Sequence, residues 1–214
     1  MTAPALLIFD CVGVLVDSER ISHLVLQAML AERGVRISFD DALARFMGTS
    51  MQRCMEEVEQ MTKVPAAEFL PLFRARTYEA FTAQLEPVAG VPALLATLRT
   101  PCCVASNGPR EKMTLTLGRT GLLGHFADAM FSADDVPRPK PAPDLFLHAA
   151  SRMSARPEDC VVIEDSPTGV RAARAAGMQV FGYAAMTPAP RLLDAGAHGV
   201  FTAMAALPTL LRLD

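Results

Sequence analysis

The chain has no apolar run close to the length that a membrane-spanning helix needs, although 51% of its 214 residues are hydrophobic. A spanning helix takes about 20 consecutive apolar residues. The N-terminus also lacks a basic segment followed by a long apolar stretch, which is the pattern of an export signal. We therefore expect a soluble, cytoplasmic protein that does not associate with a membrane.

The sequence has no excess of basic residues either. Lys and Arg number 20 against 23 Asp and Glu, which gives a net charge of -3. A nucleic-acid-binding protein usually carries a basic patch or a strongly basic balance, so nucleic acid is excluded as an expected partner. Any anionic ligand must be held by a local arrangement of side chains.

The cysteines form no recognisable pattern. There are five, an odd number, and no two are spaced as Cys-x-x-Cys, which disfavours a disulfide framework or a structural zinc site. We expect reduced thiols, most of them buried on strands, at Cys11, Cys54, Cys102, Cys103 and Cys160. Internal repeats and low-complexity tracts are absent as well.

The first third of the chain is dominated by helical patterns. Residues 5–9 are a short apolar run that predicts a strand, and from Ser18 to about Leu85 the apolar positions recur at the spacing of a helix. We predict helices from Ser18 to near Gly34 and over residues 40–47, 51–61 and 66–83. This helical block is read as an all-α insertion, residues 17–85, after the first strand.

Beyond residue 86 short β-prone runs alternate with helical ones. Strands are predicted at 102–105, 129–131, 160–163 and 179–183, with helices after Pro109, after Pro143 and around 169–176. Such alternation is typical of βαβ units. The fold class is therefore α/β, with residues 1–16 and 86–214 forming a parallel-sheet core that carries helices on both faces.

Polar residues follow four of these segments. They are Asp10; Ser106-Asn107-Gly108; Lys140 in a Pro-rich loop; and Glu164-Asp165-Ser166. In α/β sheets, ligands bind beyond the carboxyl ends of the strands, so these groups are expected to gather there. Carboxylates for a hard cation, one ammonium and a turn of small residues that leads into a helix suit phosphate together with Mg²⁺.

The same clusters, in this order, resemble the four signature motifs of the haloacid dehalogenase superfamily. The resemblance covers nearly the whole chain, from Asp10 to Ser18-Glu19, through Lys140-Pro141-x-Pro143-Asp144, to the run from Val162 to Met178. The segment 105–113 and the small helical block are most similar to the β-phosphoglucomutase-like, helical-cap branch, near the 6-phosphogluconate and sugar-phosphate phosphatases. The resemblance implies a Rossmann-like core, a helical cap domain and a small phosphorylated metabolite as substrate.

The resemblance also implies a role for each cluster. Asp10 would be the nucleophile, Lys140 would offset the charge of Asp10 and phosphate, and Ser106 with the amide of Asn107 would hydrogen-bond the phosphoryl oxygens. The Mg²⁺ cofactor would be bound by Asp10, the main-chain carbonyl of Val12 and Asp165, with Glu164 at the edge of the metal shell. The Lys140-Pro141 bond is expected to be cis.

The sequence departs from the family at position 12. Relatives carry a second aspartate there, which serves as the general acid and base, whereas this chain has Val12. A valine side chain cannot transfer a proton, although its main-chain carbonyl stays available to a metal. A positioned acid/base contributes about 10² to 10⁴ in rate, so impaired turnover is predicted.

Several readings stay open at the level of sequence. Gly48-Thr49-Ser50 occupies the place of a substrate-specificity loop, but a capping turn explains it equally well. Ser106 could simply cap the next helix, Lys140 and Glu164 could be solvated surface groups, and Asp17 could cap a helix or mark a hinge. Val12 could be an engineered change, a sequence variant of an active enzyme, or the mark of a natural pseudo-phosphatase.

Two other functions compete with hydrolysis. A phosphotransferase of the phosphoglucomutase kind is disfavoured, because related mutases carry an arginine shortly after the residue that matches Gly48, whereas here the nearest arginine is Arg53. A catalytically silent protein that binds a phosphorylated ligand is the other alternative. A monomer is expected in each case.

Overall fold

The computed structural model describes residues 3–47, 51–126 and 128–213. Within it the chain divides into two compact units. One unit consists of Met1–Asp17 together with Glu86–Asp214, and the other is Ser18–Leu85. The two are called the core unit and the helical unit below.

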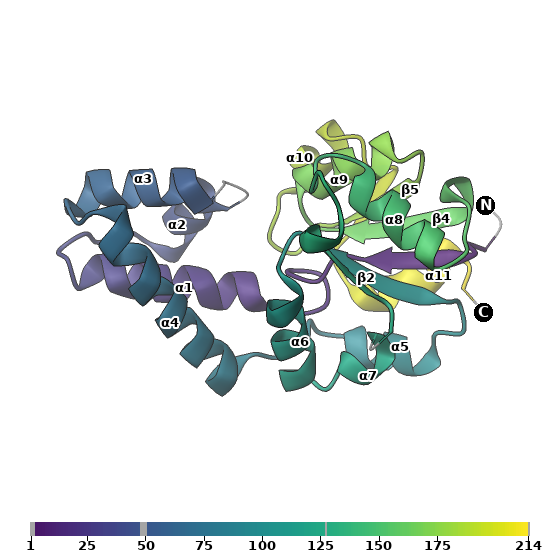
Figure 1. Ribbon diagram of the computed structural model, residues 1–214, viewed down its shortest axis with the longest axis horizontal. Helices are drawn as coiled ribbons and strands as arrows, with labels where there is room; N and C mark the ends of the chain where they lie inside the picture. The colour runs from purple at the N-terminus through teal and green to yellow at the C-terminus, as the bar shows by residue number, and fades with distance from the viewer. Residues whose placement is uncertain (1–2, 48–50, 127, 214) are drawn as a thin grey trace. The chain divides into compact units, whose positions relative to one another are not determined.

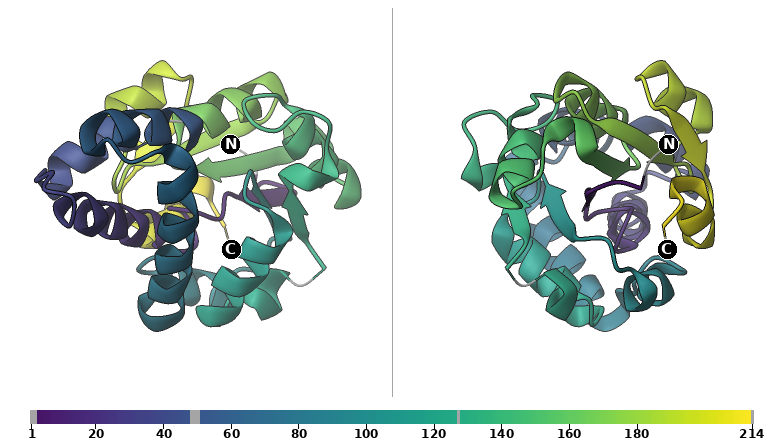
Figure 2. Two further views of the ribbon diagram at one scale, coloured as in Figure 1. Left: turned by 60° about the vertical axis from the view of Figure 1, so that its left-hand side comes forward. Right: turned by 90° about the vertical axis from the view of Figure 1, so that its right-hand side faces the viewer.

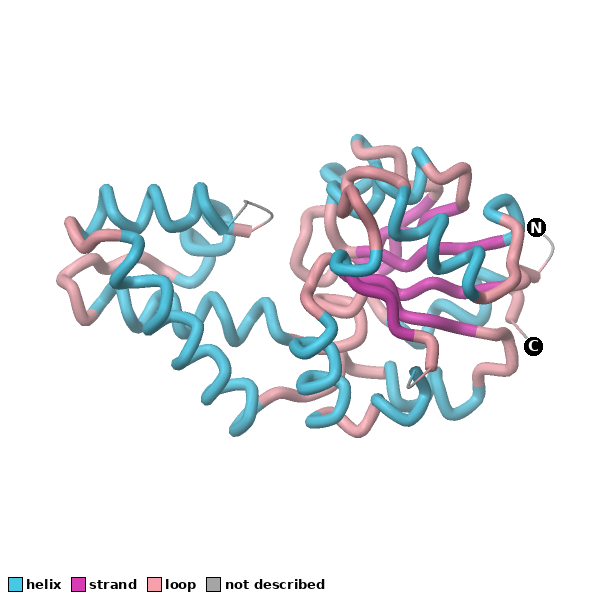
Figure 3. The backbone as a smooth tube through the Cα atoms, in the orientation of Figure 1, coloured by secondary structure: helices cyan, strands magenta, loops and turns pink. Residues whose placement is uncertain are grey.

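The core unit is built on a six-stranded sheet with the order β3-β2-β1-β4-β5-β6. Every pair of neighbouring strands is parallel, and the strands appear side by side in magenta in Figure 3. The strands are β1 (Leu6–Phe9), β2 (Cys102–Ser106), β3 (Met130–Ser132), β4 (Cys160–Glu164), β5 (Gln179–Tyr183) and β6 (Gly199–Phe201). The first strand of the chain therefore lies at the centre of the sheet, between β2 and β4 (Figure 1).

Helices cover both faces of this sheet (Figures 1 and 2). On one face α8 (Asp144–Arg152), α9 (Pro167–Ala175) and α10 (Ala189–Asp194) supply apolar side chains to a single buried cluster with the strands. On the other face Phe126 packs edge-on against Phe9 of β1, with ring centroids 6.4 Å apart. The remaining helices of the core unit are α5 (Val91–Thr97), α6 (Arg110–Arg119), α7 (Leu123–Phe126) and α11 (Leu207–Leu211).

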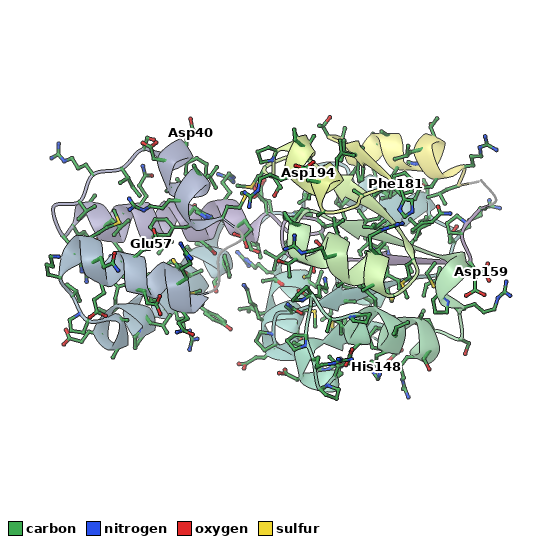
Figure 4. All side chains as sticks on the ribbon, turned by 90° about the horizontal axis from the view of Figure 1, so that it is seen from above. Asp40, Glu57, His148, Asp159, Phe181 and Asp194 are labelled. Atoms are coloured by element: carbon green, nitrogen blue, oxygen red, sulfur yellow. The ribbon has the colours of Figure 1, made fainter. Side chains whose placement is uncertain are left out.

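The helical unit has its own hydrophobic core. Its helices are α1 (Ser18–Ala31), α2 (Phe39–Phe46), α3 (Met51–Thr62) and α4 (Ala66–Gln84). The start of α2 shows why the chain becomes helical there: Ser38 accepts a hydrogen bond from the Asp41 N–H, and Asp40, labelled in Figure 4, adds a carboxylate to the first turn. Side chains from all four helices, such as Leu26, Phe46, Val58 and Phe69, bury one another.

The α/β architecture with a helical insertion confirms the predicted fold class. Elements that lack a strong sequence pattern were missed, chiefly α5, α7, α10, α11 and the edge strand β6. The cysteines are all free, with Cys103 and Cys160 buried on strands, Cys102 half-buried on β2, Cys54 buried on α3, and Cys11 buried after β1. In the described part of the chain, no helix has the length and apolar character to cross a membrane.

Candidate active site

The register of the central strands brings the predicted polar clusters together. Phe9 of β1 pairs with Val104 of β2 on one side and with Ile163 of β4 on the other. Because the strands are parallel, the residues that follow these positions emerge at the same edge of the sheet. Asp10, Ser106 and Glu164 therefore meet at the carboxyl end of the three central strands.

Lys140 connects these strands. Its Nζ donates to Asp10 Oδ1 at 2.6 Å, to Glu164 Oε1 at 2.7 Å and to the Ala105 carbonyl oxygen at 2.8 Å. Only 3% of its side chain is exposed. The ammonium also lies 4.6 Å from the centroid of the Phe146 ring. Lys140 is thus a buried cation between two carboxylates, not a solvated loop lysine, and its bond to Pro141 is cis as predicted.

Burial and charge shift the protonation of this cluster. Burial, reinforced by the nearby Glu164, raises the pKa of Asp10 to about 6, although Lys140 acts in the opposite direction. Burial alone would lower the pKa of Lys140, but Asp10 and Glu164 outweigh it and hold that pKa above its ordinary value. Lys140 therefore stays cationic and balances the charge of Asp10.

Cys11 is not a competing nucleophile. Burial and the adjacent Asp10 raise the pKa of its thiol to about 12, and the side chain is fully buried. Because the thiolate is the reactive form of cysteine, this residue is chemically silent at neutral pH. The candidate nucleophile at the end of β1 is the Asp10 carboxylate.

Glu164 is engaged through both of its oxygens. Oε1 accepts from Lys140, while Oε2 accepts from the Ser166 main-chain N–H at 3.0 Å and from the Ser166 hydroxyl at 2.9 Å. Ser166 in turn caps α9 by accepting from the Gly169 N–H. Although Glu164 was predicted at the edge of the metal shell, this geometry favours a role in holding Lys140.

Asp165 lies against the loop that follows β1. Gly13 in that loop has φ = +81°, and a Cβ atom at this position would overlap Oδ2 of Asp165. The carboxylate of Asp165 thus occupies the space that the missing side chain of Gly13 leaves. Asp165 is half-buried, so it stays accessible to a ligand.

Ser106, the last residue of β2, and Asn107, which follows it, have polar side chains with different partners. Ser106 is buried, and its Oγ accepts from the Gly108 N–H at 3.3 Å, which leaves its hydroxyl proton free to be donated. Asn107 is exposed, and its side-chain amide hydrogen-bonds the main chain of Lys140 through both its nitrogen and its oxygen. The main-chain N–H of Asn107 is then the group that fits the predicted contact with a phosphoryl oxygen.

Val12 is half-buried, two residues after Asp10, and forms an isolated bridge with Val16. Its main-chain N–H donates toward the Asp10 carboxylate, which is one cause that lowers the pKa of Asp10. Its carbonyl remains a candidate metal ligand. The predicted substrate contacts Gly48, Thr49 and Ser50 lie outside the described residues.

The donor set fits Mg²⁺. Three carboxylates, those of Asp10, Glu164 and Asp165, accompany the single ammonium of Lys140, so a phosphate dianion would meet excess negative charge without a second cation. No group of three or more His, Cys, Asp or Glu side chains in the described ranges could hold a metal alone. Mg²⁺ is commonly bound by one or two carboxylates completed by water and substrate phosphate, which matches Asp10 and Asp165.

Sequence reasoning missed several supporting groups. Phe146 lies six residues after Lys140 in the first turn of α8, and its apolar type gave no sign that it lies beside an ammonium. Gly13 and Gly169 belong to the motifs, but their roles depend on neighbours that only folding supplies. The one sequence signal that could have indicated these roles is the position of each glycine just before or after a carboxylate cluster.

Comparisons with known proteins bear on the family of this chain. The family described as haloacid dehalogenase-like hydrolase matches residues 4–177. The 6-phosphogluconate phosphatase of Escherichia coli (strain K12) is 34% identical over 204 residues, covering 94% of this chain and 92% of its own.

Two solved structures are similar over almost their whole length. A conserved haloacid dehalogenase-like protein of unknown function from Agrobacterium tumefaciens shares 38% identity with a TM-score of 0.89, and 97% of each chain is covered. A haloacid dehalogenase family hydrolase from Deinococcus radiodurans, solved with bound phosphate and sodium, shares 33% identity with a TM-score of 0.88, covering 99% of this chain and 96% of that one.

Proposed function

This chain belongs to the haloacid dehalogenase-like hydrolases, and from that premise we propose that it is a phosphatase of sugar phosphates that uses Asp10 as its nucleophile. The observation that carries the proposal is the buried Asp10 carboxylate at the end of β1, held 2.6 Å from Lys140 Nζ. The D. radiodurans relative binds phosphate, which supports a phosphoryl ligand for this family of sites.

The first half-reaction is transfer of the phosphoryl group to Asp10. One carboxylate oxygen of Asp10 attacks phosphorus, the bond to the sugar oxygen breaks, and the leaving oxygen needs a proton. Lys140 offsets the charge of the nucleophile, while the Ser106 hydroxyl and the Asn107 main-chain N–H donate to the phosphoryl oxygens. Asp10, Asp165 and the Val12 carbonyl would hold Mg²⁺, which would supply further charge neutralisation when bound.

The second half-reaction returns Asp10 to its free state. Water attacks the phosphorus of the aspartyl-phosphate, and a base must take the proton from that water. Val12 can neither give the first proton nor accept the second. Losing an acid/base of this kind raises the barrier by about 3 to 5 kcal/mol, so turnover of a sugar phosphate is slow in this chain.

The Val12→Asp variant tests this proposal. We expect Mg²⁺-dependent hydrolysis of a panel of sugar phosphates to rise by about 10² to 10⁴ over the unsubstituted chain. Val12→Asn is the matched control, because it has the size and polarity of aspartate but cannot transfer a proton. Activity would be measured as released inorganic phosphate.

The unsubstituted chain, with Val12, offers a second readout. With p-nitrophenyl phosphate the good leaving group needs little protonation, so we expect a burst of nitrophenol followed by slow turnover, with phosphate retained on Asp10. Intact-mass spectrometry would detect the added phosphate. Absence of Mg²⁺-dependent activity in Val12→Asp, together with absence of the burst, would contradict the proposal and favour a silent phosphate-binding protein.

A further inference from the structure

The ammonium of Lys140 has no hydrogen left to donate. An ammonium carries three N–H donors, and Asp10, Glu164 and the Ala105 carbonyl accept one each, all within 2.8 Å. The Phe146 ring approaches the same ammonium. Lys140 can therefore act on the reaction by its charge and by where it holds Asp10, and its placement must be well defined.

The main chain of Lys140 is fixed by a separate residue. Asn107 Nδ2 donates to the Lys140 carbonyl oxygen at 3.0 Å, and the Lys140 N–H donates to Asn107 Oδ1 at 2.9 Å. The side-chain amide of Asn107 thus donates to the main-chain acceptor of Lys140 and accepts from its main-chain donor. Asparagine matches this pair, whereas aspartate lacks the donor and alanine lacks both.

Few other side-chain interactions hold the loop around Lys140. The exposed ion pair of Arg138 with Asp144 closes its base, with Arg138 Nη2 2.8 Å from Asp144 Oδ1. That pair fixes the two ends of the loop but touches no atom of Lys140. The pair of bonds from Asn107 connects Lys140 directly to the end of β2, beside Ser106.

We propose that Asn107 is a positioning residue, whose side chain holds Lys140 in place for Asp10 and does not itself bind the substrate. This inference rests on the proposed function, since it concerns how the same nucleophile is supported. It assigns the Asn107 side chain to Lys140, and it leaves the main-chain N–H of Asn107 for the predicted contact with a phosphoryl oxygen.

The activity test uses the Val12→Asp background. We expect Asn107→Ala to lower kcat about 10- to 100-fold, the usual effect of a small misplacement, while KM changes less than about threefold. Asn107→Asp should lose as much, because its carboxylate would face the Lys140 carbonyl. Arg138→Ala is the control for simple loosening of the loop and should leave kcat within about twofold.

A double-mutant cycle separates positioning from an independent role. If Asn107 acts through Lys140, adding Asn107→Ala to Lys140→Met should cause little further loss of kcat. Losses that multiply, or a rise in KM without a fall in kcat, would overturn the inference. Either result would return the Asn107 side chain to substrate binding.

A second measurement needs no catalysis and so stands apart from the proposed function. Amine acylation followed by mass spectrometry compares Lys140 with Lys63 and Lys112, which complete the lysines of the chain. We expect Asn107→Ala to speed modification of Lys140 about tenfold, since two hydrogen bonds no longer oppose its displacement. Rates at Lys63 and Lys112 should not change. An unchanged rate at Lys140 would overturn the inference even if the enzyme is active, whereas a faster rate in an inactive protein would leave only the proposed function refuted.

Discussion

At the scale of single residues, the site depends on a few atoms whose loss has different consequences. Val12 stands where the proposed mechanism needs a proton carrier, but the main-chain groups of that position remain. Lys140 is surrounded by acceptors, and removing it would leave Asp10 and Glu164 as two buried carboxylates without their shared cation. An unpaired buried charge is far more costly than an absent ion pair. In the proposed mechanism Lys140 therefore contributes both to the chemistry and to the integrity of the site.

Gly13 is the residue whose substitution most directly tests Asp165. Gly13→Ala places a Cβ where the Asp165 carboxylate lies and also strains a backbone with φ = +81°. We expect the strain to cost roughly 1–2 kcal/mol of unfolding free energy. The displaced carboxylate should in addition weaken Mg²⁺ binding at least about tenfold, because one candidate ligand is lost.

Gly121→Ala is the matched control for that change. Gly121 has φ = +74° in the same unit, but nothing lies within 4 Å of the Cβ it would gain. Gly121→Ala should lower the free energy of unfolding about as much as Gly13→Ala does, and it should bind Mg²⁺ with the affinity of the unsubstituted chain. Denaturant unfolding and titration calorimetry with MgCl2 measure the two quantities. Equal Mg²⁺ affinity in both variants would show that Asp165 is not a ligand.

At the scale of elements, the packing of α9 against the end of β4 sets the position of Glu164. Ser166 begins the helix and bonds Glu164, and Gly169 in its first turn leaves room for the Glu164 carboxylate. A helix N-terminus also carries partial positive charge, which favours the buried carboxylate beside it. The start of α9 and the hydrogen bonds of Lys140 are therefore coupled through Glu164.

Gly169→Ala tests this coupling. A Cβ there would overlap the Glu164 carboxylate, so Glu164 must leave Lys140 or α9 must move. We expect a loss of about 2 to 4 kcal/mol in unfolding free energy, in the range of a disrupted buried charge network. Urea unfolding gives the value.

Gly118→Ala provides the comparison, because it is also a helical glycine in the core unit. Its new Cβ would only reach ordinary contact with Leu123 at 3.8 Å. Alanine is the better helix former, so Gly118→Ala should be neutral or more stable by up to about 1 kcal/mol. A Gly169→Ala protein as stable as Gly118→Ala would show that Glu164 is not constrained by α9.

At the scale of the whole molecule, the two units bury separate apolar clusters. The cluster around β1, β4 and α8 draws only on the core unit, and the cluster around Leu26, Phe46 and Phe69 only on the helical unit. The described candidate ligands of phosphate and Mg²⁺ all belong to the core unit. Ligand binding should therefore stabilise the two units unequally.

Hydrogen exchange can measure this difference. When inorganic phosphate is added at about 100 times its dissociation constant, with Mg²⁺ present in both samples, the native state gains about 2.7 kcal/mol, which slows globally exchanging amides about 100-fold. We expect that slowing in β1 and β4 and little change in α3. The Asp165→Asn variant should show much less protection of β1. Equal slowing in both units would mean that they unfold as one.

Much of the fold could be predicted because its signals are local. The apolar runs of β1, β4 and β5 and the helical spacing of α1, α3 and α4 specify those elements from sequence alone. The short α7, α10 and α11 and the strand β6 have weak patterns, and they form because neighbours bury them. Their existence was decided by packing, which a single sequence does not display.

The sequence by itself determined the family, the order of the four polar clusters and the presence of valine at position 12, because these depend only on which residues occur and in what order. The tertiary structure alone decided how the clusters divide their work. It placed both oxygens of Glu164 on Lys140 and Ser166, turned the Asn107 side chain to the Lys140 main chain, and fitted Asp165 against Gly13. These assignments depend on distances between residues far apart in the chain, which the register of a parallel sheet sets and the sequence does not state.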